Sequence, residues 1–176
     1  MMLRKINAVL SLVITGMLLN HAISLGAWML SRGAVQISVS NMPWVMLRLM
    51  GVHALISIIL LIRTYKGSKK NKGTSYVKMN IPTVVQRISG GLLVLFTGLH
   101  VAGAAGFMQP PQVVHAIVPP LFFTLVMAHV AVSVSKAFVT LGIGNAKTMK
   151  VVDIVTKVIC VVTLIADVVG FYLFVC

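Results

Sequence analysis

Acidic side chains are almost missing from this sequence, which has no glutamate and two aspartates against 15 lysines and arginines. Cysteine is also scarce, because the chain has only Cys160 and Cys176, both in its last apolar segment. Two cysteines at this spacing make neither a disulfide framework nor a zinc-binding motif. Zinc and di-metal centres need ligands that converge on one point, usually with carboxylates among them, so such centres are disfavoured.

Long hydrophilic stretches are missing as well. Only 10% of the residues are charged, and the one hydrophilic segment of any length is residues 66–80. That segment is too short to fold as a domain, so we expect no soluble catalytic domain. With 59% hydrophobic residues and a mean hydropathy of +1.02, the chain has more apolar surface than a water-soluble domain of this size can bury.

Five apolar segments are long enough to cross a membrane, since a spanning helix needs about 20 residues. They are residues 6–30, 43–62, 88–107, 113–138 and 154–175. The first is too long for the apolar part of a signal peptide and lacks a small-residue cleavage site, so we expect it to be a span. Pro119 and Pro120 should kink or loosen the outer turn of the fourth. The expected fold class is all-α and integral to the membrane, with residues 1–176 forming a single transmembrane domain of five helices.

The basic residues lie on one side of this arrangement, apart from Arg32 and Arg48. They stand before the first span, between the second and third spans, and between the fourth and fifth. Cytoplasmic loops carry an excess of Lys and Arg, which predicts a cytoplasmic N-terminus in a bacterial-type inner membrane. A net charge of +13 would suggest nucleic acid in a soluble protein. Here the charges flank membrane spans, so we expect contact with membrane lipid or a cytoplasmic partner and none with nucleic acid.

Each of the first four spans carries one histidine well inside it: His21, His53, His100 and His129. Histidines inside a membrane are rare and usually functional. At about 1.5 Å of rise per residue, His21 and His100 lie roughly 20 Å from the cytoplasmic edge, and His53 and His129 lie roughly 10–15 Å from it. The four therefore form an outer pair, on spans one and three, and an inner pair, on spans two and four.

In a four-helix bundle whose neighbours follow chain order, spans one and three are diagonal, and so are spans two and four. Two imidazoles that face each other across a bundle core are what bis-histidine haem ligation requires. We therefore predict that the first four spans form a haem-binding bundle with two haems b, one ligated by His21 and His100 and the other by His53 and His129. A single histidine in a membrane is more often a packing residue, so the prediction depends on the matched depths.

Other polar residues in the spans are candidates for contact with a haem or a quinone. His115, near the outer end of span four, is placed to approach the outer haem or a quinone, or is simply interfacial. Arg48 is level with the outer pair, and its charge needs compensation. Its partner is either a propionate of the outer haem or Asp167, the only acid deep in span five. Asp153 and Lys157, four residues apart, are expected to pair on the surface at the start of the fifth span.

These features together resemble a known family. Five spans, one histidine in each of the first four, no soluble domain, and the segment Gln86-Arg87-Ile88-Ser89-Gly90 at the start of span three look like the dihaem cytochrome b subunit of succinate dehydrogenase and fumarate reductase. The resemblance covers essentially the whole chain and rests mainly on the histidine pattern. It implies a subunit that does not itself carry the dehydrogenase chemistry. Such a subunit anchors a flavoprotein and an iron–sulfur protein at the cytoplasmic face and relays electrons between them and a membrane quinone, here expected to be menaquinone.

The resemblance also implies roles for individual residues. His53 and His129 would ligate the haem proximal to the iron–sulfur subunit, and His21 and His100 would ligate the distal haem. Two residues at the cytoplasmic start of span three, Arg87 and Ser89, would lie near a haem or a quinone. The chain departs from the family in having no glutamate, which some members use to handle quinol protons; the only substitutes are Asp167 and His115.

Two other functions fit the same sequence. One is a dihaem cytochrome b of another quinone-linked dehydrogenase or of a hydrogenase, although those families usually pair their histidines on other helices. The other is a small helical transporter or assembly protein without haem, in which the histidines serve packing.

Overall fold

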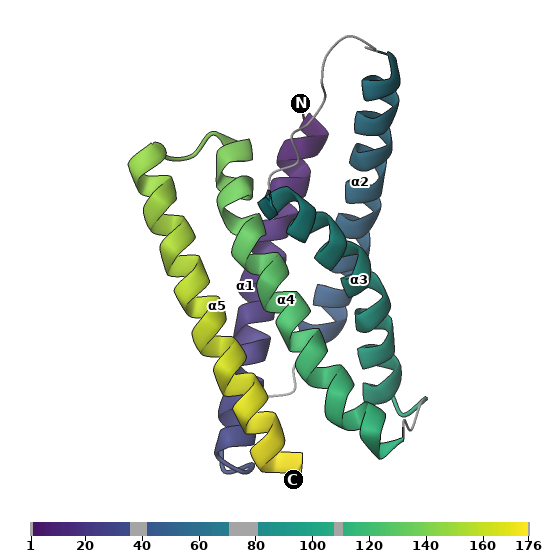
Figure 1. The fold of residues 1–176 in the computed structure, drawn as a ribbon, viewed down its shortest axis with the longest axis vertical. Helices are drawn as coiled ribbons and strands as arrows, with labels where there is room; N and C mark the ends of the chain where they lie inside the picture. Colours follow the sequence, from purple (N-terminus) through teal and green to yellow (C-terminus); the bar gives the residue numbers. More distant parts are fainter. Residues whose placement is uncertain (1, 36–41, 71–80, 108–110, 176) are drawn as a thin grey trace.

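The computed structural model describes residues 2–35, 42–70, 81–107 and 111–175, which form five long α-helices running up and down (Figure 1). The helices are α1 (Met2–Leu30), α2 (Met42–Lys70), α3 (Ile81–Ala104), α4 (Gln112–Leu141) and α5 (Ala146–Val175). Each contains a segment long and apolar enough to cross a membrane. The all-α class and the five candidate spans are therefore confirmed, and they support a multi-pass membrane protein.

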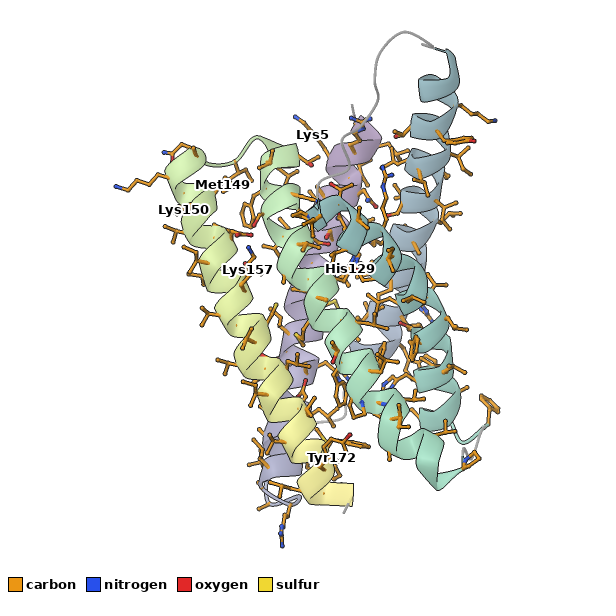
Figure 2. The ribbon with its side chains drawn as sticks, viewed as in Figure 1. Lys5, His129, Met149, Lys150, Lys157 and Tyr172 are labelled. Carbon is orange, nitrogen blue, oxygen red and sulfur yellow. The ribbon has the colours of Figure 1, made fainter. Side chains whose placement is uncertain are left out.

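The two ends of the bundle differ in charge. One end of the bundle, at the top of Figure 1, contains the starts of α1, α3 and α5 and the ends of α2 and α4. Figure 2 places Lys5 and Lys150 at this end, which we call the basic end, and Tyr172 at the opposite end. The chain termini lie at opposite ends of the bundle, as five passes require (Figure 1).

The helix α3 begins seven residues earlier than the predicted span. It starts at Ile81 rather than Ile88, with Pro82 in its first turn. Proline suits this position because an N–H in the first turn would have no partner within the helix. Gln86 and Arg87 therefore lie inside the helix, where their side chains can pack against a neighbouring helix.

The last helix also begins earlier than predicted, at Ala146 rather than Ile154. Asn145 caps it, because its Oδ1 accepts a hydrogen bond of 2.9 Å from the Thr148 N–H. The preceding helix, α4, runs unbroken through Pro119 and Pro120. The two prolines therefore do not interrupt this helix.

Helix packing places α1 and α4 at the centre. The helix α4 contacts α1, α3 and α5, and α1 contacts α2, α4 and α5. Over the described residues, α1 shares no extended line of contact with α3, and α2 shares none with α4, so these two pairs of helices are diagonal. The helices α2 and α3 share none either, so the group of four departs from the predicted bundle, in which neighbours follow chain order. The fifth helix packs outside this group of four (Figure 1). The main cluster of buried apolar residues comes mostly from α4: Ala22, Val126, Met127, Val130, Val134 and Cys160.

Candidate functional site

The four histidines inside the spans form two pairs. The imidazoles of His21 on α1 and His100 on α3 lie close enough for their charges to interact, and so do those of His53 on α2 and His129 on α4. Each pair joins two diagonal helices of the bundle. Figure 2 shows His129 among the helices, between the two ends of the bundle. The structure thus brings together the partners expected from depth, while their role as haem ligands stays a prediction.

The side chain of His129 is held by a serine on the adjacent helix. Ser89 Oγ lies 2.6 Å from the Val85 carbonyl oxygen, to which it donates, and 3.0 Å from His129 Nδ1. A hydroxyl has one proton, so we assign the second contact as Nδ1–H donating to Oγ. This tautomer leaves the lone pair of Nε2 free, which is the state that a metal-binding imidazole needs.

A glycine brings the His129 ring against the backbone of α3. A Cβ built on Gly90 would lie 3.1 Å from His129 Cε1 and 3.5 Å from Nδ1. The first distance is shorter than ordinary van der Waals contact, so a larger residue here would displace the ring. Ser89 and Gly90 therefore act on the same histidine, one through a hydrogen bond and the other through space.

A group of polar residues continues from His129 towards the basic end. We call Thr83 and Gln86 of α3 and Ser133 and Lys136 of α4 the polar seam. Gln86 Nε2 donates to Ser133 Oγ at 3.2 Å, and Gln86 Oε1 accepts from Lys136 Nζ at 2.9 Å. Lys136 Nζ also donates to Thr83 Oγ1 at 3.2 Å. The seam ties α3 to α4 and holds a cation close enough to His129 for their charges to interact.

His53 on α2, the partner of His129, has one ring nitrogen without a hydrogen bond among the described residues. Among the described residues, His53 Nδ1 is buried with no hydrogen-bond partner. The ring also interacts with the backbone of Asn7 on α1. The side chain of Asn7 donates from Nδ2 to Ser57 Oγ at 3.1 Å, one turn beyond His53. A buried ring nitrogen without a partner is costly unless another group occupies it.

The outer pair has less polar surroundings. His100 stacks on Phe122 of α4, with ring centroids 5.1 Å apart and an angle of 28° between the planes. Thr97 lies one turn earlier on α3, and its buried Oγ1 has no hydrogen-bond partner among the described residues. His21 is half-buried on α1. Each pair thus has a buried polar atom without a partner nearby, and the inner pair also lies close to the charge of Lys136.

The Arg48–Asp167 ion pair, one of two alternatives for Arg48, is absent. Asp167 is 1% exposed, and neither carboxylate oxygen has a hydrogen-bond partner among the described residues. Its Oδ1 would lie 2.7 Å from a Cβ on Gly26, so it packs on the backbone of α1. Arg48 is exposed on α2, which shares no extended contact with α5. The alternative was wrong because α1 lies between the two helices.

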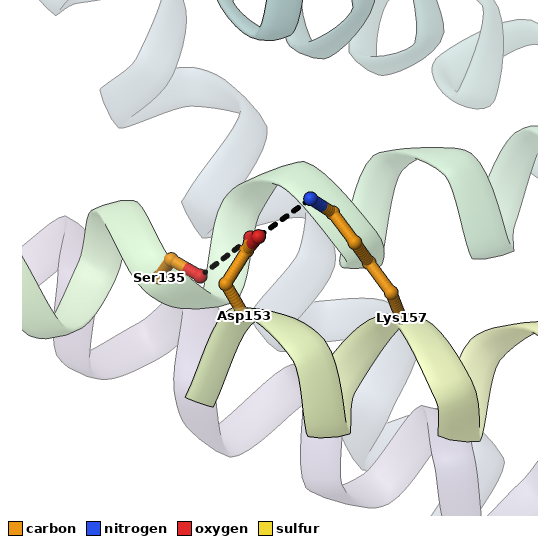
Figure 3. Close-up of polar contacts among 3 residues, drawn as sticks. All are labelled: Ser135, Asp153 and Lys157. Carbon is orange, nitrogen blue, oxygen red and sulfur yellow. Dashed lines mark hydrogen bonds and ion pairs between the residues drawn. The ribbon is translucent and has the colours of Figure 1, made fainter. Parts of the chain in front are cut away.

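The remaining predicted residues have different outcomes. Arg87 is exposed on α3, with its charge near that of Lys136. The backbone of His115 lies in α4, but its side chain is outside the described part of the chain. The predicted ion pair between Asp153 and Lys157 is confirmed, since Lys157 Nζ lies 2.5 Å from Asp153 Oδ2. Ser135 of α4 also donates to Asp153 Oδ1 at 3.1 Å, which links α4 to α5 (Figure 3).

Several residues around the pairs were not identified from the sequence as site residues. They are Asn7, Thr83, Gln86, Gly90, Thr97 and Lys136. The sequence does contain a signal for Lys136, because it follows His129 by seven residues and so lies two turns further along the same face of α4. Thr97 likewise precedes His100 by three residues. Extending each histidine's helical face in both directions would have found both.

The donor set fits haem b better than a bare metal ion. In the described part of the chain, no three side chains of His, Cys, Asp or Glu gather at one point. Haem iron takes four nitrogens from the porphyrin and needs only two axial ligands, which a pair of imidazoles provides.

Comparison of the chain with protein-family models, with curated proteins and with solved structures found no match.

Proposed function

We propose that this protein is a dihaem cytochrome b that relays electrons between a cytoplasmic iron–sulfur subunit and membrane quinone, as the anchor subunit of a succinate dehydrogenase or fumarate reductase. One observation carries the haem assignment: the histidines pair across both diagonals of the bundle. The choice of enzyme rests on the family resemblance of the histidine pattern. Bound haem b supplies one-electron transfer, while the protein supplies ligands, orientation and local charge.

The residues of the chain have separate tasks in this proposal. His53 and His129 hold the proximal haem, with Ser89 keeping the proton on His129 Nδ1 and away from the ligating nitrogen. His21 and His100 hold the distal haem, with Phe122 stacked on the His100 ring. Apolar side chains of α4 exclude water from the interior, which lowers the local dielectric constant and strengthens each nearby charge.

The charge distribution supports an orientation and a docking face. The positive-inside rule places the basic end in the cytoplasm and the protein in a bacterial-type inner membrane. Lys147 and Lys150 are exposed at this end, at the start of α5. They suit contact with anionic lipid and with the flavoprotein and iron–sulfur partners.

An optical spectrum of the purified full-length chain tests the haem assignment. We expect sharp α bands in the reduced form, typical of bis-histidine haem b, and a pyridine haemochrome assay that gives about two haems per chain. A colourless protein purified from haem-replete cells would reject the proposal and favour the transporter or assembly protein.

Copurification under mild detergent then identifies the enzyme. Flavin and iron–sulfur subunits with succinate dehydrogenase or fumarate reductase activity are expected, whereas other partners would indicate a different quinone-linked dehydrogenase or a hydrogenase.

Replacing Ser89 by alanine should weaken binding of the proximal haem by about 10- to 100-fold, the usual effect of losing a group that orients a ligand. The hydroxyl is the partner of His129 Nδ1, and without it neither the tautomer nor the ring angle is held. Haem retained per chain during transfer to apomyoglobin measures the change. Ser135→Ala, on the face of α4 that meets α5, is the matched control and should retain haem like the unmodified chain.

A further inference from the structure

Among the described residues, the ammonium group of Lys136 donates only to neutral partners. The two acids of the chain lie elsewhere, since Asp153 pairs with Lys157 and Asp167 packs on α1. An ammonium has three N–H donors, and the described residues accept two of them, at Thr83 Oγ1 and Gln86 Oε1. The charge of Arg87 also lies close to that of Lys136. This corner of the bundle therefore has an excess of positive charge.

The polar seam fixes where that charge lies. The side-chain amide of Gln86 has a fixed orientation. Its Nε2 donates to Ser133, which is 4% exposed, so its Oε1 faces Lys136. Lys136 is held between α3 and α4, on the face of α4 that also carries His129. By contrast, Lys147 and Lys150 are exposed at the start of α5.

We propose that Lys136, held by Gln86 and Thr83, is the counter-ion of a propionate carboxylate of the haem ligated by His53 and His129; this rests on the proposed function. Each haem b has two propionates, and a negative charge next to a membrane interior needs a cation or hydrogen-bond donors nearby. Lys136 meets that need beside the inner pair. The anchored Nζ favours a carboxylate of a fixed group over a lipid phosphate, which would be met as well by the exposed lysines.

Potentiometric titration of the purified complex, followed in the haem α bands, tests the proposal. Lys136→Met and Lys136→Gln should each lower the midpoint potential of one haem, because the cation opposes the negative charge of the propionate and so favours the added electron. We expect about a tenfold fall in the ratio of reduced to oxidised haem at a fixed potential, which is about 59 mV for one electron. Lys136→Arg keeps the charge and should keep the potential. Lys157→Met, at a lysine that has an acid partner, should leave both haems unchanged.

Other results would reject the assignment. If both neutral variants retain two haems with unchanged potentials, Lys136 is not a propionate counter-ion. Loss of bound phosphatidylglycerol from the same variants, measured by native mass spectrometry, would then identify a lipid phosphate as the occupant. If the neutral variants and Lys136→Arg shift the potential equally, the effect comes from the packing of the seam and not from charge. An unmodified chain without haem would instead reject the proposed function itself.

Discussion

Alanine at His129 is expected to halve the haem content of the protein and to remove one of two α bands, because an axial ligand of one haem is lost. Alanine at His53 should do the same. The double variant His53→Ala/His129→Ala should still retain the other haem, since both changes affect one site. The double variant His100→Ala/His129→Ala should lose both. Pyridine haemochrome assays and reduced-minus-oxidised spectra measure these outcomes.

The double variants test the pairing itself rather than a general need for histidine. If adjacent helices supplied the pairs instead, as α1 with α2 and α3 with α4, the two double variants would exchange their results. His100→Ala/His129→Ala would then keep one haem, and His53→Ala/His129→Ala would lose both. That result would contradict the diagonal arrangement, in which the charge of His21 interacts with that of His100 and the charge of His53 with that of His129.

Alanine at Gly26 should destabilise the bundle by about 1–3 kcal/mol, the usual cost of overpacking a well-packed contact. Its Cβ would lie 2.7 Å from Asp167 Oδ1, and Asp167 is 1% exposed, so the carboxyl has no room to move. Adding Asp167→Ala to this variant removes the clash and should restore part of the lost stability. Unfolding in mixed micelles with increasing sodium dodecyl sulfate measures the change.

The control for this prediction is Gly16→Ala on the same helix, where a Cβ meets nothing within 4 Å. It reports the gain in helix propensity, about 1 kcal/mol in soluble helices, without any new contact. Asp167→Ala alone reports the cost of the cavity. Equal stabilities for Gly16→Ala and Gly26→Ala would mean that Asp167 does not press on α1.

Much of the fold could be read from the sequence because it depends on distances along single helices. Five apolar runs predicted five candidate spans, and the spacing of Asp153 and Lys157 predicted their ion pair. Depth follows from a constant rise per residue, so the chain positions of the histidines predicted the pairs His21 with His100 and His53 with His129, whose charges lie close enough to interact. The helix starts were less accurate, since α3 and α5 continue beyond the apolar segments into polar residues that form helix equally well.

The segment Gln86-Arg87-Ile88-Ser89-Gly90 shows what sequence reasoning left open. As a pattern it indicated a polar group near a haem or a quinone, and it predicted contacts for Arg87 and Ser89. In the structure Ser89 bonds the His129 ring, Gly90 makes room for it and Gln86 anchors Lys136, while Arg87 is exposed. Three of the five residues thus have partners on α4 that lie about 40 to 50 positions away in the chain.

The sequence by itself determined the number of candidate spans and the excess of cations at one end of the bundle, and it predicted the depth of each histidine, since these follow from composition and from rise along a helix. Only the tertiary structure decided which neighbour each helical face meets. That choice depends on how all five helices pack, and rotation about a helix axis changes no distance along the chain. It placed Asp167 against α1 rather than beside Arg48, and it placed Ser89, Gln86 and Lys136 together around His129.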